Sequence, residues 1–119
     1  MNIHPAYWET IQKLMEEFPG TEESTSYGTP AFKVKKKLLL RLREDWETLV
    51  IHSDDRDIWI DKDPDVFYVT DHYRNYPYVL VNLKKVKKAQ LKAVIIQSWK
   101  EMAPKKLLDT YEAGGKASR

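Results

Sequence analysis

The sequence predicts a small α+β domain, and two observations indicate this class. Apolar residues recur at helical spacing in two segments, 5–18 and 87–102, which frame the chain. Between them, short runs rich in β-branched and aromatic residues have the pattern of β-strands. Strands that follow one another closely pair most simply in antiparallel order. We therefore expect an antiparallel sheet of about five strands with helices packed on it.

The first helix is expected over residues 5–18. Its apolar residues are spaced by four, three and four positions, which places them on one face: Tyr7, Ile11, Leu14 and Phe18. Pro5 suits a first helical turn, and Pro19-Gly20 ends the helix.

Three strands are expected between Thr21 and Ser53, at residues 31–34, 38–42 and 48–52. Lys35, Lys36 and Lys37 separate the first two and predict a hairpin tip, although no glycine there defines the turn type. Glu44-Asp45 predicts the next turn.

The acidic segment 54–63 is expected to hold a turn and a short middle helix around Ile58–Ile60, ending before Pro64. Residues 66–70 and 78–83 are the clearest strands, because they are rich in β-branched and aromatic side chains. Residues 71–77 connect them.

A long amphipathic helix is expected over residues 87–102. Its apolar face follows the i, i+3, i+4 rule and comprises Leu91, Val94, Ile95, Ser98, Trp99 and Met102. Ala103-Pro104 ends it, and residues 105–112 predict one more short helix. We expect one domain over residues 1–113 and a flexible polar tail over 114–119.

Composition excludes several classes of protein and site. The chain has 119 residues, 42% of them hydrophobic, which permits one folded core. It has no cysteine, which rules out disulfides, thiolate nucleophiles and cysteine zinc sites. No signal peptide or membrane-spanning run is visible, so we expect a cytoplasmic protein without a membrane partner. The net charge of +2 is too small to indicate a partner, so charge distribution must decide.

Several strings, taken in order, resemble the MmcQ/YjbR family from about Tyr7 to Leu108. They are Phe18-Pro19-Gly20-Thr21, Tyr27-Gly28-Thr29-Pro30-Ala31-Phe32, Asp63-Pro64-Asp65-Val66-Phe67-Tyr68-Val69-Thr70, His72-Tyr73-Arg74, Tyr76-Pro77-Tyr78-Val79, and Trp99 with Ala103-Pro104-Lys105-Lys106-Leu107. The resemblance implies a secretion-chaperone-like α+β fold. It also implies "double wing" DNA binding, with two β-hairpins as contact elements, and it supplies no catalytic residue or cofactor. Many members have acidic residues where this chain has Lys84-Lys85-Val86-Lys87-Lys88.

This lysine run is the first candidate for a binding site. Positive side chains at a helix N-terminus oppose the helix dipole, at about 0.3–1 kcal/mol each. Backbone N–H groups there favour anions, so Lys84, Lys85, Lys87 and Lys88 predict a phosphate-binding site. The alternative is a charge run that only keeps the protein in solution.

The hairpin tip is the second candidate. Lys35, Lys36 and Lys37 would lie along a nucleic-acid backbone as simple charge partners. The alternative is protection of an exposed strand against aggregation, for which lysine is also suited.

The third candidate is the segment Asp71–Tyr78, which combines an imidazole, a guanidinium and three phenols. Arg74 can hold a phosphate bidentately, and Tyr73 or Tyr76 can stack on a base. Alternatively, the tyrosines and proline stiffen a loop. A catalytic role for His72 is disfavoured, because no nucleophile or paired base stands at a recognised spacing.

A metal site is not expected. Carboxylates between Asp54 and Asp65 suit hard cations, but their spacing does not match a calcium loop, and the three histidines are scattered. A solvated acidic face explains this run. Trp59 is expected to be partly buried under the sheet edge.

Two hypotheses therefore follow. The first is a non-enzymatic protein that binds nucleic acid through the lysines, Arg74, Tyr73 and Tyr76. The second is a chaperone-like or adaptor domain that binds protein, either as a monomer or as a homodimer. The resemblance to secretion chaperones suggests it, as does Ile96, which lies outside the apolar arc of the last helix. An enzyme or small-molecule binder using His72 and Arg74 would need a pocket beside that segment.

Overall fold

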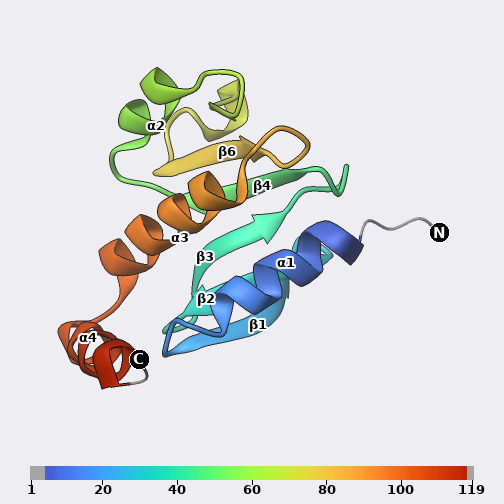
Figure 1. Ribbon diagram of the computed structural model, residues 1–119. Coiled ribbons are helices and arrows are strands. Elements are labelled where there is room, and N and C mark those ends of the chain that lie inside the picture. The colour runs from blue at the N-terminus through green and yellow to red at the C-terminus, as the bar shows by residue number, and fades with distance from the viewer. Residues whose placement is uncertain (1–4, 118–119) are drawn as a thin grey trace.

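A six-stranded antiparallel sheet forms the centre of the molecule, in the strand order β1-β2-β3-β4-β6-β5. The computed structural model describes residues 5–117, with side chains described for residues 7–111 (Figure 1). The elements are α1 (Pro5–Met15), β1 (Thr21–Ser26), β2 (Thr29–Val34), β3 (Lys37–Leu42), β4 (Thr48–His52), α2 (Arg56–Lys62), β5 (Phe67–Tyr68), η1 (Asp71–Tyr73), β6 (Tyr78–Asn82), α3 (Lys88–Met102) and α4 (Lys105–Ala117). The α+β class is thus confirmed.

One face of the sheet, here called the helix face, packs against α1 and α3. Leu49 and Ile51 of β4 alternate with Val50, so that both point toward the helices and are fully buried. Trp99 of α3 is also fully buried, and its indole N–H donates to the Pro19 carbonyl at 3.1 Å. This bond satisfies a polar group that would be costly to bury alone.

The opposite face of the sheet has a smaller apolar cluster. Val50 and Leu80 project from β4 and β6 and are covered by Tyr73. The segment Asp71–Tyr78 therefore crosses over the sheet, and packing there fixes its position.

The structure differs from several of the predicted elements. Helix α1 ends at Met15 and not at residue 18, and β2 begins at Thr29 and not at residue 31. The sixth strand, β1, was not predicted individually, because its sequence Thr21–Ser26 is polar and lies at a sheet edge. The strand expected over residues 66–70 is only Phe67–Tyr68. Helix α4 continues to Ala117, past its expected end at residue 112 and past the expected start of the tail at 114, whereas residues 118–119 lie outside the described residues.

The β2–β3 hairpin turns through two lysines in the left-handed region. The φ angles of Lys35 and Lys36 are 51° and 68°. Two consecutive positive φ values are typical of a type I′ turn, which asparagine or glycine normally occupies. The hairpin therefore forms without the residues that usually indicate it.

Candidate nucleic-acid interface

The two lysine clusters lie at opposite ends of the sheet. Val34 pairs with Lys37 at the end of β2, so the tip that carries Lys35–Lys37, here called the lysine hairpin, projects beyond that end. The segment Lys84–Lys88, here called the lysine turn, follows β6, which runs antiparallel to β4 and ends beside Thr48. Because β4 starts where β3 has finished, the lysine turn lies at the other end, as Figure 1 shows. The two clusters are therefore separated by the length of the sheet.

The lysine turn is shaped by Asn82. Its side-chain oxygen accepts the Lys84 N–H at 3.0 Å, and its carbonyl accepts the N–H groups of Lys85 and Val86 at 3.1 and 3.0 Å. Val86 packs against the core, which anchors the turn. The four lysine side chains are consequently held outward, and all four residues are exposed.

Neighbouring acidic side chains are mostly engaged elsewhere. Glu47 is 3.6 Å from Lys84, but Lys85, Lys87 and Lys88 form no ion pair with any residue that the structure describes. Burial acts to raise the pKa of Asp45, yet the N–H groups of Glu47 and Thr48 and the Thr48 hydroxyl outweigh it, so the pKa is lowered. Asp45 therefore stabilises its own β3–β4 turn as a carboxylate.

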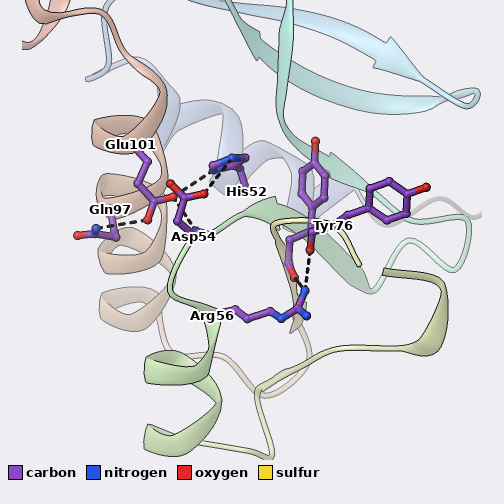
Figure 2. Close-up of polar contacts among 7 residues, drawn as sticks. His52, Asp54, Arg56, Tyr76, Gln97 and Glu101 are labelled. Carbon is purple, nitrogen blue, oxygen red and sulfur yellow. Dashed lines mark hydrogen bonds and ion pairs between the residues drawn. The ribbon is translucent and has the colours of Figure 1, made fainter. Parts of the chain in front are cut away.

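The segment Asp71–Tyr78 is organised by Arg56, the first residue of α2. Its Nη1 donates to the carbonyls of Tyr73, Tyr76 and Tyr78, and its Nη2 donates to that of Arg74. Figure 2 shows the Arg56 side chain extended toward the segment that carries Tyr76. A planar guanidinium can serve several acceptors at once, which a lysine could not do in the same geometry. Sequence reasoning missed Arg56, because carbonyl acceptors leave no trace in the sequence.

Arg74 does not join the lysine turn. It precedes β6, whereas the lysines follow it, and the four steps of β6 alone span about 14 Å. The Arg74 guanidinium is 2.5 Å from the Asp71 carboxylate, and both side chains are largely exposed. A pocket of about 500 Å³ lies beside Arg74, and Asp54, Asp55 and Asp57 also line it. These carboxylates make that pocket a poor place for a polyanion.

The aromatic candidates separate into one buried and one exposed residue. Tyr73 is only 9% exposed and its hydroxyl accepts a hydrogen bond from Arg41, so its ring is unavailable for stacking on a base. Tyr76 is 57% exposed, but it lies in the segment that Arg56 holds, away from the lysine turn. His72 is exposed and its ring packs edge-on against Tyr73.

A histidine–carboxylate cluster connects β4 to α3. His52 Nδ1 lies 3.1 Å from Glu101 Oε1, which also accepts the Asp54 N–H at 3.0 Å (Figure 2). Gln97 donates to the other Glu101 oxygen at 3.4 Å. Ligand-type atoms of His52, Asp54 and Glu101 all lie within 4.8 Å of one another. Glu101 Oε1 is already engaged in these hydrogen bonds, so we interpret the cluster as a structural connection between β4 and α3 and not as a metal site. This connection is here called the latch.

Two further expectations concern apolar residues. Trp59 is half-buried and packs against the core, as expected, with its ring 5.4 Å from that of Phe67. Ile96 is also half-buried and packs against the core, so it does not provide the exposed apolar surface that suggested a protein partner. Within residues 5–117, no helix is both long and apolar enough to span a bilayer.

Comparison with known proteins identifies a family. A family model described as YjbR matches residues 16–101. The uncharacterized protein Rv2570 of Mycobacterium tuberculosis (strain ATCC 25618 / H37Rv) is 35% identical over 51 residues. The uncharacterized protein Mb2600 of Mycobacterium bovis matches equally. Each match covers 43% of this chain and 40% of the relative.

Proposed function

The protein belongs to the YjbR family, and we propose that this member is a non-enzymatic protein that binds nucleic acid through the lysine turn. The contact would be made to phosphates, with DNA as the expected ligand. Sequence specificity is not part of the proposal, since phosphate contacts carry no base information.

The proposal rests on exposed lysines that oppose the dipole of α3 and form no stabilising ion pair with the described residues. Lys85, Lys87 and Lys88 are exposed at the N-terminus of α3, and no acidic residue lies in its first turn. Each cation there opposes the helix dipole by about 0.3–1 kcal/mol. With no ion pair to a described residue, these lysines are arranged for an external anion rather than for the fold.

Neighbouring structure favours a backbone contact at the same end of the sheet. At the N-terminus of α3 the Gln90 side chain accepts the Lys87 N–H at 2.8 Å. The N–H groups that follow have no backbone acceptor within a helix, so they are the ones that can donate to a phosphate between the lysines. Arg43, in the β3–β4 turn, adds a positive charge, which also helps to lower the pKa of Asp45. The β3–β4 turn is adjacent, since the Leu83 N–H donates to the Glu47 carbonyl at 2.9 Å.

The lysine hairpin and Arg74 are not included in this interface. Both lie toward the other end of the sheet, where three aspartates and Glu101 reduce the positive potential. This restricts the sequence hypothesis, which combined all the basic groups into one surface.

The test is a binding titration with two matched variants. In one variant, here called the lysine-turn variant, Lys84, Lys85, Lys87 and Lys88 are changed to Gln. In the other, here called the hairpin variant, the three lysines of the lysine hairpin and the neighbouring Lys33 of β2 are changed to Gln. Each loses four positive charges, so net charge is the same in both. We expect labelled double-stranded DNA to bind the hairpin variant nearly as well as the natural chain, and the lysine-turn variant at least about tenfold more weakly at low salt. Equal weakening in both would indicate net charge alone.

The second candidate is an adaptor or homodimer, favoured by the free edge of β1. This strand pairs with β2 on one side and with no described strand on the other. A strand from another chain can add to such an edge. Analytical ultracentrifugation tests it: a concentration-dependent dimer that is abolished by Thr25→Pro supports edge pairing, and a monomer at all concentrations contradicts it.

A further inference from the structure

A buried guanidinium lies on the sheet face opposite the helices. Arg41 of β3 is only 5% exposed and pairs across the strands with Val50. Its Nη1 donates to the Thr29 hydroxyl at 3.0 Å and to the Leu42 carbonyl at 3.3 Å, and its Nη2 donates to the Tyr73 hydroxyl at 3.1 Å. All three acceptors are neutral.

The positive charge of Arg41 is incompletely balanced. The nearest carboxylate, that of Glu44, is 3.6 Å from Nη1 and belongs to a side chain that is 63% exposed. The Nε atom is buried and has no hydrogen-bond partner among the described residues. A buried cation normally has a close, hydrogen-bonded counter-charge, because removing it from water is costly. The Arg41 guanidinium can therefore accept an anion in addition to the Glu44 carboxylate as its counter-charge.

A pocket opens on this group. It has a volume of about 430 Å³ and is lined by Tyr27, Arg41, Arg43, Glu44, His72 and Tyr73. This volume is within the usual range of about 300–1,000 Å³ for small-ligand sites. Arg43 and His72 supply further groups that can donate to an anion, and Glu44 alone among the lining residues opposes one.

An aromatic surface stands at the mouth of the same pocket. Tyr27 is 82% exposed, which is unusual for so large a side chain, and its ring lies 5.1 Å from the Arg41 guanidinium carbon. Tyr27 and Gly28 have φ angles of 52° and 80° and form the two-residue turn between β1 and β2, which holds the Tyr27 ring at the tip of that hairpin. An exposed ring beside a cation suits a ligand with a planar ring and a negative group.

We propose that this pocket binds a nucleoside monophosphate, with the phosphate between Arg41 and Arg43 and the base stacked on Tyr27. Such a ligand occurs free or as the 5′-phosphorylated end of a strand, and both present the same chemistry. The site shares Arg43 with the proposed interface. It goes beyond the proposed function because it uses none of the lysine-turn residues and takes a different ligand. On binding, the phosphate replaces Glu44 as the counter-charge of Arg41.

The test uses exposed or half-buried residues, because Arg41 variants are at risk of misfolding. AMP and inorganic phosphate are titrated at low ionic strength, with binding measured by calorimetry and mapped by amide NMR shifts. We expect Glu44→Gln to strengthen AMP binding and Arg43→Gln to weaken it, each by about fivefold. Tyr27→Ala should weaken AMP but leave inorganic phosphate unchanged. The four-lysine variant of the lysine turn should bind AMP normally, which separates this site from the proposed function.

Two oligonucleotides distinguish the sources of the ligand. AMP binding with shifts around Tyr27 and Arg43 identifies a free nucleotide site. Binding of a 5′-phosphorylated oligonucleotide in preference to its 5′-hydroxyl counterpart, without AMP binding, identifies a strand end. Absence of both effects, or a Glu44→Gln variant that binds no more tightly, overturns the proposal.

Discussion

Arg56 is expected to hold the Asp71–Tyr78 segment in place, and Arg56→Ala tests this. The substitution removes the donor to four carbonyls, at distances of 3.1, 2.6, 3.1 and 2.5 Å. Two of these acceptors, on Tyr76 and Arg74, are in exposed bonds and can accept from water instead. The other two, on Tyr73 and Tyr78, are in partly buried bonds and lose their partner.

The expected loss can be worked from these bonds. A hydrogen bond with a charged donor contributes about 1.5–3 kcal/mol, and the two partly buried bonds fall at the low end of that range, so we expect a loss of about 3 kcal/mol. A domain of this size typically unfolds with about 5–15 kcal/mol, so the variant should still fold. Its thermal midpoint should fall by about 10 °C.

Urea unfolding followed by tryptophan fluorescence measures the loss, since the chain has four tryptophans. Arg74→Ala is the matched control, because it removes a guanidinium from the same segment. Its exposed pair with Asp71 should contribute less than about 0.5 kcal/mol. If Arg56→Ala cost no more than Arg74→Ala, the carbonyl contacts would not hold the segment.

Three further substitutions test other parts of the fold. Asp45→Asn should cost about 1 kcal/mol at pH 7. Because the folded pKa of Asp45 is lowered, this difference should be present above the unfolded pKa and disappear as the pH falls through the folded pKa, which urea unfolding across pH measures. Gly20→Ala should cost about 2 kcal/mol, since φ is 79° and a Cβ would lie 2.3 Å from Leu107 Cδ1. Its control Gly28→Ala, with φ of 80° and open space, should cost about 1 kcal/mol by the same measurement. Glu101→Ala should cost about 1–2 kcal/mol by releasing His52 and the Asp54 N–H, and amide hydrogen exchange should rise at Asp54; unchanged exchange there would argue against the latch.

Elements with a buried apolar face could be predicted from the sequence. Helix α3 was predicted to within one residue, because its spacing of Leu91, Ile95 and Trp99 is strongly periodic. Strand β1 was missed because Thr21–Ser26 has no apolar side chain, and pairing with β2 alone defines it. Helix α4 ran longer than expected because Gly114 and Gly115 normally disfavour helix, and tertiary context overrides such propensities.

The candidate site was predicted less completely. Lysine exposure in the turn follows from the sequence, but the separation of the two clusters depends on strand order, which local patterns do not determine. Arg41 stands between Leu40 and Leu42 in the sequence, a position that does not distinguish a buried arginine from an exposed one. Its burial depends on the crossing of Tyr73 over the sheet, which the structure shows. Arg56 and Glu101 act through backbone groups and distant residues, so no local pattern could indicate them.

The salt dependence of DNA binding tests the central claim most directly. For double-stranded DNA, the logarithm of the binding constant falls with the logarithm of salt concentration by about 0.9 per phosphate neutralised. Replacing Lys84, Lys85, Lys87 and Lys88 by Gln should therefore reduce the magnitude of this slope by about 3–4, while the matched hairpin variant should retain the natural slope. A slope unchanged by the lysine-turn substitutions, or no binding by the natural chain at low salt, would contradict the account.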